Sequence, residues 1–183
     1  MASDFSIRHA AHIINHGGVI AYPTDTIYGL GCDPYNYDAV EKVNRIKQRP
    51  LDKTFILLAG EIEQIKPLIL ISEEQEKTIT QNAEPTSWVV DASPQAPPWL
   101  IDDKNTLTIR ISKHHDVKRL CHALGHTIIS TSANISGKKP AKNALELHKY
   151  FHQSVDKILL SSKDKASKAS KIIRLCDNYV IRH

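Results

Sequence analysis

This chain of 183 residues lacks the features that mark several large classes of protein. Its three cysteines form no close pair, which argues against a disulfide framework and a zinc cluster and favours a reducing environment. No apolar run approaches the roughly 20 residues that span a bilayer. The first residues, Met-Ala-Ser-Asp-Phe, carry no basic start and no apolar core, so we expect no secretory signal. These absences predict a cytoplasmic protein without membrane contact.

Familiar catalytic signatures are also missing. The chain has no Gly-x-x-x-x-Gly-Lys-[Ser/Thr] sequence, which excludes a Walker A loop, and no Gly-x-Ser-x-Gly nucleophile elbow. Histidines recur at helical spacing, but none belongs to a His-Glu-x-x-His motif, so solvated helix faces explain them better than metal sites. We therefore predict no metal site built by the protein; the histidines concerned are His9, His12, His16, His122 and His126.

The composition is that of an ordinary globular protein, but its charge is uneven. Hydrophobic residues make up 41% and charged residues 24%, which with the length predicts one domain spanning residues 1–183. The net charge is +4, yet residues 138–183 hold eleven Lys and Arg against four Asp and Glu. Such a basic segment suits a phosphate-bearing partner such as RNA or a nucleotide. A solvated lysine-rich surface explains it equally well.

Apolar periodicity predicts helices and strands that alternate along the chain. This alternation is typical of an α/β layer sandwich with a mixed, twisted sheet. The predicted helices cover 7–16, 39–48, 61–70, 73–82, 115–124 and 143–152, and the predicted strands cover 19–22, 54–59, 87–90, 106–111, 127–130, 155–160, 171–175 and 179–182.

A hydroxyl-rich turn follows the first predicted strand. The segment 22–31 reads Tyr-Pro-Thr-Asp-Thr-Ile-Tyr-Gly-Leu-Gly and places Thr24 and Thr26 just past the strand. Ligands of open α/β sheets bind beyond the carboxyl ends of strands, and hydroxyls both donate and accept hydrogen bonds. A tight turn capped by Thr and Asp is the structural alternative.

Three cations lie close together after the helix at 39–48. The segment 47–53 reads Lys-Gln-Arg-Pro-Leu-Asp-Lys and contributes Lys47, Arg49 and Lys53. Cations beside a hydroxyl-rich loop suit a triphosphate, whose leaving group needs its charge neutralised. For Lys47 alone, interaction with the helix dipole is an alternative that contributes about 0.3–1 kcal/mol.

A second polar loop and a lone arginine complete the candidates. The segment 130–137 reads Ser-Thr-Ser-Ala-Asn-Ile-Ser-Gly and lies between a predicted strand and a predicted helix. Backbone N–H groups and hydroxyls in such a position can cradle an anion, although a capping turn would use the same residues. Arg110 interrupts an apolar strand, where it either binds a ligand or lies on the surface of an edge strand.

In combination and order, these segments resemble the YrdC-like family of threonylcarbamoyl-AMP synthases, in its short single-domain bacterial form. The matching motifs are the segments 22–31 and 130–137, Lys-Gln-Arg-Pro at 47–50 with Lys53, and Leu-Thr-Ile-Arg-Ile at 107–111. The resemblance covers nearly the whole chain. It implies an α/β fold with a twisted open sheet and a concave, positively charged cavity.

The resemblance also implies an activity and its residues. The family condenses L-threonine, bicarbonate and ATP to threonylcarbamoyl-AMP with release of pyrophosphate, and the product feeds a tRNA-modifying complex. ATP is expected to bring Mg2+. By resemblance the catalytic quartet is Lys47, Arg49, Ser132 and Asn134. Our candidates for the threonine site are Thr24, Arg110 and Ser130, and the expected nucleotide site adds Lys53, Ser87 and Ser170 to the quartet.

Two segments depart from the family pattern. Where the family carries Pro-Gly-Pro-x-Thr, residues 83–87 read Ala-Glu-Pro-Thr-Ser, which places Glu84 close to the expected triphosphate. Where the family tends to have Pro-Ser-Thr-Ile-Val-Asp, residues 169–174 read Ala-Ser-Lys-Ile-Ile-Arg, so only Ser170 carries over with confidence.

Two other functions remain open from the sequence. The basic C-terminal segment and the altered motif at 83–87 also suit a non-catalytic module that binds tRNA or double-stranded RNA. The intact quartet favours the enzyme, since a binding module has no need of Ser132 and Asn134 at fixed spacing from two cations. A related carbamoyl-transfer enzyme that uses another amine is the third reading.

Overall fold

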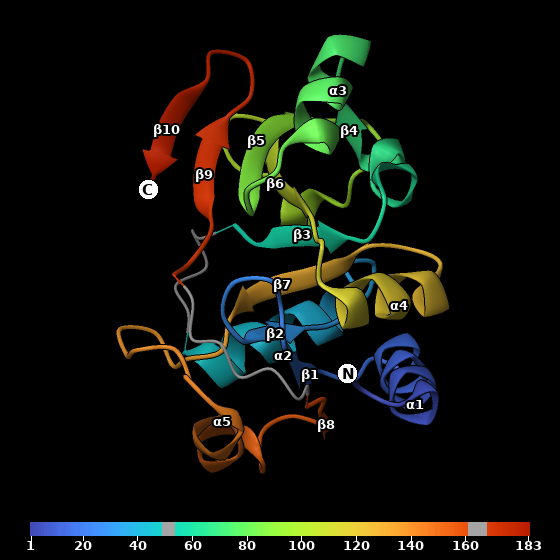
Figure 1. Ribbon diagram of the computed structural model, residues 1–183, viewed down its shortest axis with the longest axis vertical. Coiled ribbons are helices and arrows are strands. Elements are labelled where there is room, and N and C mark those ends of the chain that lie inside the picture. The colour runs from blue at the N-terminus through green and yellow to red at the C-terminus, as the bar shows by residue number, and fades with distance from the viewer. Residues whose placement is uncertain (49–53, 161–167) are drawn as a thin grey trace.

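The sheet and helices described here come from a computed structural model that describes residues 1–48, 54–160 and 168–183. Ten strands form one twisted sheet with mixed parallel and antiparallel pairing, and helices flank it (Figure 1). The strand order is β10-β9-β5-β6-β3-β7-β2-β1-β8, and β4 pairs with β5. Within the described residues the sheet does not close, so the predicted open α/β architecture is confirmed.

The elements have the following bounds. The helices are α1 (Asp4–Asn15), α2 (Tyr37–Lys47), α3 (Glu73–Gln81), α4 (His115–Leu124) and α5 (Ala144–Phe151), with 3-10 turns η1 (Ile62–Gln64), η2 (Lys66–Leu68) and η3 (Pro98–Leu100). The strands are β1 (Ile20–Tyr22), β2 (Gly29–Gly31), β3 (Ile56–Ala59), β4 (Ile69–Leu70), β5 (Thr86–Ala92), β6 (Thr106–Ile111), β7 (Ile128–Ser132), β8 (Lys157–Ile158), β9 (Lys171–Arg174) and β10 (Tyr179–Arg182).

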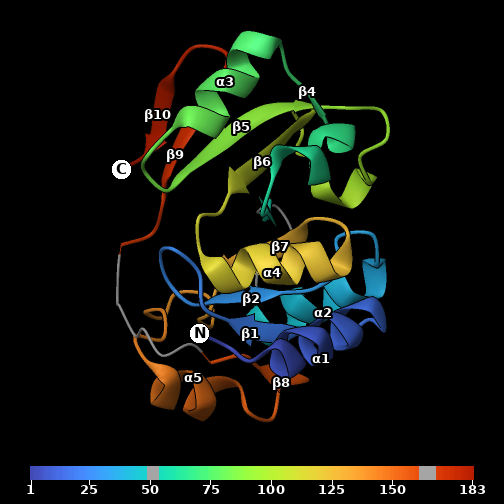
Figure 2. The same cartoon turned by 45° about the vertical axis from the view of Figure 1, so that its right-hand side comes forward.

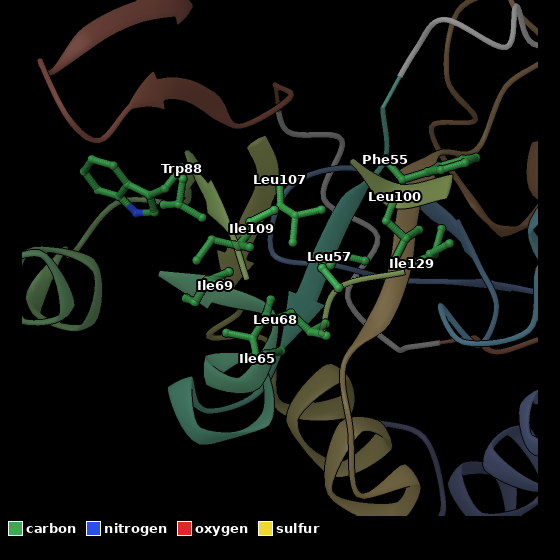
Figure 3. Packing of buried hydrophobic residues seen from close by; sticks show 14 of the residues in the cluster. Phe55, Leu57, Ile65, Leu68, Ile69, Trp88, Leu100, Leu107, Ile109 and Ile129 are labelled. Carbon is green, nitrogen blue, oxygen red and sulfur yellow. The ribbon is translucent and has the colours of Figure 1, made fainter. Parts of the chain in front are cut away.

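Apolar side chains cover both faces of the central strands. Neighbouring residues of β3 point in opposite directions, so Leu57 packs into one cluster and Leu58 into another. The first cluster includes Trp88, Leu107 and Ile109 from β5 and β6 (Figure 3). The second lies under α1 and α4, which pack side by side (Figure 2). The continuous apolar run at 54–59 therefore indicated a buried central strand correctly.

The predicted helix at 61–70 is wrong, and strand β2 was missed. The segment 61–70 is not one helix but η1, η2 and β4, because Pro67 has no N–H to donate and disfavours helical backbone at the residue before it. Its buried residues Ile62, Ile65 and Leu68 recur every three positions, which is the 3-10 period.

The other error concerns β2, which was expected to be part of a loop. It pairs with β1 on one side and β7 on the other. Its glycines hide the strand from sequence patterns but are needed there, because a Cβ on Gly31 would collide with the carbonyl oxygen of Ile129.

A buried carboxylate fastens the N-terminus to α4. Asp116 is 1% exposed and accepts hydrogen bonds from the backbone N of Ala2 (3.1 Å) and from Arg119 (3.2 Å). Burial by itself would raise the pKa of Asp116, but the Ala2 hydrogen bond and the neighbouring His115 and His114 outweigh it and hold the pKa below the ordinary 3.8. Such a group stabilises the fold above its unfolded-state pKa and loses that contribution as pH falls through its folded-state pKa.

We expect Asp116→Asn to lower the free energy of unfolding at neutral pH by about 1–3 kcal/mol, because it weakens charge-assisted hydrogen bonds in a buried place. The loss should shrink as pH falls below about 3.8, the ordinary pKa of the carboxyl, because the unfolded wild-type chain then takes up a proton before the folded one does. Urea titrations between pH 3 and pH 7 measure both effects. The control is Asp4→Asn, which removes a 79% exposed partner of the same arginine and should change stability by less than about 0.5 kcal/mol. An equal loss for Asp116→Asn at both ends of the pH range would contradict this account.

In the part of the chain that the structure describes, no helix combines the length and the apolar character needed to cross a bilayer.

Candidate active site

A cavity of about 450 Å3 opens where β1 and β7 end and β2 begins. Residues from distant parts of the sequence form its walls, and most of them carry hydroxyls or apolar groups. Two arginines and no carboxylate are among the described lining residues, which are Thr24, Thr26, Ile27, Tyr28, Gly29, Thr54, Ile56, Thr108, Arg110, Ser130, Thr131, Ser132, Pro140, Ala169, Ser170, Ile172 and Arg182.

Arg110 is one of the two charged residues in the described lining of this cavity. It is 3% exposed and lies on β6 between β5 and β3, so the reading as a surface residue of an edge strand is wrong. Its Nη1 donates to Thr26 Oγ1 (3.0 Å), and Nη2 lies 3.3 Å from Asp25 Oδ1. Burial lowers the pKa of Arg110 and Asp25 opposes that shift, and a guanidinium stays charged in either case.

One donor of Arg110 is unused. Among the described residues its Nε is the buried side-chain atom that has no hydrogen-bond partner. A buried unsatisfied donor is costly, at about 1–3 kcal/mol, and such a group calls for a specific explanation. Because Arg110 lines the cavity, an anion bound there can use this donor, and a carboxylate matches the fork of a guanidinium.

The loop after β1 is held in place by its own hydroxyl groups. Thr24 Oγ1 donates to the carbonyl oxygen of Ile27 (2.7 Å) and accepts from the backbone N of Thr26 (3.1 Å). Thr24 therefore caps a turn, as the structural alternative expected, and it also lines the cavity. Its role toward a ligand stays a prediction. Ser130 faces the same space from β7.

Three of the four quartet residues meet at the end of β7. Lys47 is the last residue of α2 and is only 2% exposed. Its Nζ donates to the carbonyl oxygen of Ser132, to that of Asn134 (2.8 Å) and to Asn134 Oδ1 (3.2 Å). Ser132 Oγ donates to the same Oδ1 (2.5 Å). Lys47 thus holds the loop that carries Ser132 and Asn134, which is more than a helix-dipole contact at the surface.

The amide of Asn134 extends this network. Its Nδ2 donates to the carbonyl oxygens of Ile135 (2.9 Å) and Lys138 (2.8 Å), so the loop is closed on itself. The predicted roles of these residues toward phosphate stay predictions. Arg49 and Lys53 lie outside the described residues.

A pair of hydroxyl groups joins β5 to the residue that precedes β9, on the part of the cavity lined by Ser170. Ser87 Oγ and Ser170 Oγ are 2.8 Å apart; Ser170 lines the cavity and Ser87 is fully buried behind it. Sequence reasoning missed Arg182, whose Nε (3.1 Å) and Nη2 (2.8 Å) both donate to the carbonyl oxygen of Ser170. Burial lowers the pKa of Arg182, and the charge of Arg110 adds to this shift. An isolated arginine in the last strand gave no signal, because only the folded sheet brings it to the cavity.

Asp25 was also missed, although it lies inside the recognised motif. It pairs with Arg110 and accepts a hydrogen bond from Ser112 Oγ (3.2 Å). A carboxylate between two threonines, in a chain that also places an arginine inside an apolar strand, was the available signal.

Glu84, the acid that replaces the family's glycine, forms an ion pair in this structure. Its side chain is 65% exposed, it is absent from the described lining of the cavity, and its Oε2 is 2.6 Å from Lys171 Nζ. The hydrogen bond from Lys171 lowers the pKa of Glu84. Glu84 is therefore paired with a cation and is not among the described lining residues, and its expected place beside the triphosphate stays a prediction.

Comparisons with known proteins agree with this architecture. A model of the Sua5/YciO/YrdC family, described as telomere recombination, matches residues 12–183. The threonylcarbamoyl-AMP synthase of Hydrogenovibrio crunogenus is 44% identical over 140 residues, covering 74% of this chain and 75% of the relative. That of Pseudomonas putida is 37% identical and covers 100% of this chain and 99% of the relative.

Solved structures extend the likeness to three dimensions. Sua5 from P. abyssi, complexed with L-threonine, superposes with a TM-score of 0.88 at 28% identity, and the match covers 96% of this chain and 52% of that protein. This chain thus spans about half of the Sua5 chain. E. coli YciO gives the same TM-score at 25% identity, over 99% of this chain and 90% of YciO. The chain belongs to the Sua5/YciO/YrdC family.

Proposed function

We propose that this protein is an L-threonylcarbamoyladenylate synthase, a nucleotidyltransferase that condenses L-threonine, bicarbonate and ATP. The observation that carries the proposal is the unpartnered buried Nε of Arg110 at a hydroxyl-lined cavity beside the cluster of Lys47, Ser132 and Asn134. The names of the bacterial relatives and the threonine complex of P. abyssi Sua5 support it.

We assign the part of the cavity that Arg110 lines to the threonine substrate. The substrate carboxylate would accept from Arg110 Nε, with Asp25 and Thr26 holding the other two nitrogens in position. Thr24 and Ser130 supply hydroxyls for the remaining polar groups of the amino acid. A carboxylate on a buried guanidinium is both charge-assisted and directional, which fixes the amine relative to the loop at the end of β7.

The nucleotide end would use the loop at the end of β7 and the Ser170 wall. Ser132 and Asn134 present polar groups that Lys47 holds in place, and Ser87 acts through Ser170. Lys47, Arg49 and Lys53 are our candidates for neutralising the phosphates. The protein has no need of a side-chain nucleophile, because substrate atoms make every new bond.

The reaction needs positioning and charge stabilisation. The threonine nitrogen bonds to the carbon of bicarbonate and water leaves, which gives a carbamate. A carbamate oxygen then bonds to the α-phosphorus of ATP, and the bond from that phosphorus to the bridging oxygen breaks as pyrophosphate departs. Fixed cations stabilise the charge that develops on the leaving group.

Mg2+ would enter as part of the substrate. Across the described ranges, no three His, Cys, Asp or Glu side chains converge as a metal site. Asp25, the carboxylate nearest to Arg110, is already engaged by that arginine and by Ser112. ATP phosphates commonly carry Mg2+ with most of its coordination supplied by water and phosphate.

The product would feed a tRNA-modifying complex that transfers the threonylcarbamoyl group. The alternative of a non-catalytic module that binds tRNA or double-stranded RNA is less well supported, since it leaves the buried Arg110 donor without a ligand.

The proposal predicts that ATP is cleaved to pyrophosphate only when threonine and bicarbonate are both present. Measuring pyrophosphate release with each substrate omitted in turn tests this. Cleavage that ignores threonine would overturn the proposal. Serine is an informative competitor, although one methyl group gives a preference of only about 1–3 kcal/mol.

A further inference from the structure

We propose that Glu84 and Lys171 are positioning residues that clamp β9 to the segment before β5 and so hold Ser170 in the cavity wall. The inference rests on the proposed function in one respect, namely that the wall carrying Ser170 contacts the nucleotide. Its core is a structural claim about two charged residues that line no part of the cavity.

The contact joins the start of two neighbouring strands. Lys171 Nζ lies 2.6 Å from Glu84 Oε2, and the residues are 87 positions apart in the sequence. Strands β5 and β9 pair in parallel, with Thr86 opposite Lys171. Lys171 directly follows Ser170, so the ion pair acts at the point where the chain enters the sheet from the cavity.

The contacts between β5 and the start of β9 differ on the two faces of the sheet. Ser170 and Ile172 line the cavity but Lys171 does not, as expected for side chains that alternate along a strand. The Ser87–Ser170 hydroxyl pair therefore links β5 to the start of β9 on the face toward the cavity, and the Glu84–Lys171 ion pair links the two segments on the opposite face. Arg182 fixes the carbonyl oxygen of Ser170 from β10.

The two residues are complementary departures from the family pattern. Glu84 stands where the resembling motif has glycine, and Lys171 stands where the other motif has threonine. Either substitution alone would leave an unmatched charge at the edge of the sheet; together they make an ion pair between the start of β9 and the segment before β5. Opposite charges at this contact attract each other, and like charges there would repel.

Charge-swap variants test the clamp with the full chain. We expect Glu84→Lys and Lys171→Glu each to weaken binding of the ATP analogue with a methylene between the α- and β-phosphates by about two- to fivefold in calorimetry, the range of an exposed ion pair. The double swap should restore the affinity. Backbone amides at 171–173 should exchange hydrogen faster in each single variant and return to the wild-type rate in the double.

The signs separate the clamp from simple charge effects. If the two side chains acted only through their charge on the ATP phosphates, Glu84→Lys would tighten binding of the analogue and Lys171→Glu would weaken it. The double swap would then have an affinity between those of the two single variants. Opposite signs of that kind, or exchange rates at 171–173 that do not change, would overturn the proposal. The control is the same swap at Lys66–Glu76, an exposed pair 2.8 Å apart, which should leave the affinity unchanged.

Failure of the proposed function would give a different result from failure of the clamp. If wild-type protein does not bind the ATP analogue, the function proposed for the site and the nucleotide role of the Ser170 wall both fall. The exchange rates at 171–173 still decide whether the ion pair clamps β9.

Discussion

Lys47→Ala is expected to lower kcat by at least about 10²–10³-fold. The Nζ group of Lys47 donates to three acceptors in the loop that carries Ser132 and Asn134, so its removal both frees the loop and takes a cation from the site. The carbonyl oxygens of Ser132 and Asn134 would lose the donor that Lys47 supplies, while Asn134 Oδ1 would keep only the hydrogen bond from Ser132 Oγ. Steady-state pyrophosphate release measures the loss.

The matched control for this variant is Lys42→Ala on the same helix. Lys42 forms an ion pair with Asp156 at the surface, so its loss should leave kcat within about twofold of wild type. Thermal unfolding of both variants shows whether a lower kcat comes from a displaced loop in a folded protein or from unfolding of the whole protein. Wild-type kcat in Lys47→Ala would contradict the role given to this lysine.

Arg110→Lys is expected to reduce kcat/KM for threonine by about 10- to 100-fold, the size of a lost hydrogen bond between charged groups. Lysine keeps the positive charge beside Asp25 but lacks the fork that holds Asp25, Thr26 and a carboxylate together. Alanine is the poorer test, because it would leave the carboxylate of Asp25 unpaired in a buried place. Calorimetry with threonine and kinetics at varied threonine measure the change.

Binding of the ATP analogue should persist in Arg110→Lys, because the nucleotide end of the site uses other residues. Arg174→Lys is the control; its guanidinium pairs with Asp177 on the surface, and threonine use should not change. A variant that lost ATP binding as strongly as threonine binding would show that Arg110 supports the whole cavity and not its threonine end.

The sequence predicted the sheet well where apolar runs were long. The run at 54–59 gave a strand buried on both faces, and the alternation of elements gave the α/β class. It failed at 61–70, where a three-residue apolar period was read as an α-helical one, and at β2, where glycines required by close backbone packing removed the usual strand signal. The first error was local, because Pro67 and the three-residue period were visible in the sequence, whereas the second arose because tertiary packing requires the glycines of β2.

The candidate site was predictable only in part for the same reason. Motifs located Lys47, Ser132 and Asn134, and the fold brings the three into one network. Arg182 contributes through a strand at the far end of the chain, and no local pattern points from it to Ser170. Glu84 was placed near the expected triphosphate by its position in a motif, and no local pattern pointed to its ion pair with Lys171, 87 positions away.

The most direct test of the account is to supply 13C-labelled bicarbonate with ATP and threonine and to identify the products by mass spectrometry. The account predicts an adenylate that contains one labelled carbon and the threonine skeleton, formed in equal amount to pyrophosphate. Pyrophosphate released without label in an adenylate, or label in a product that lacks threonine, would contradict it.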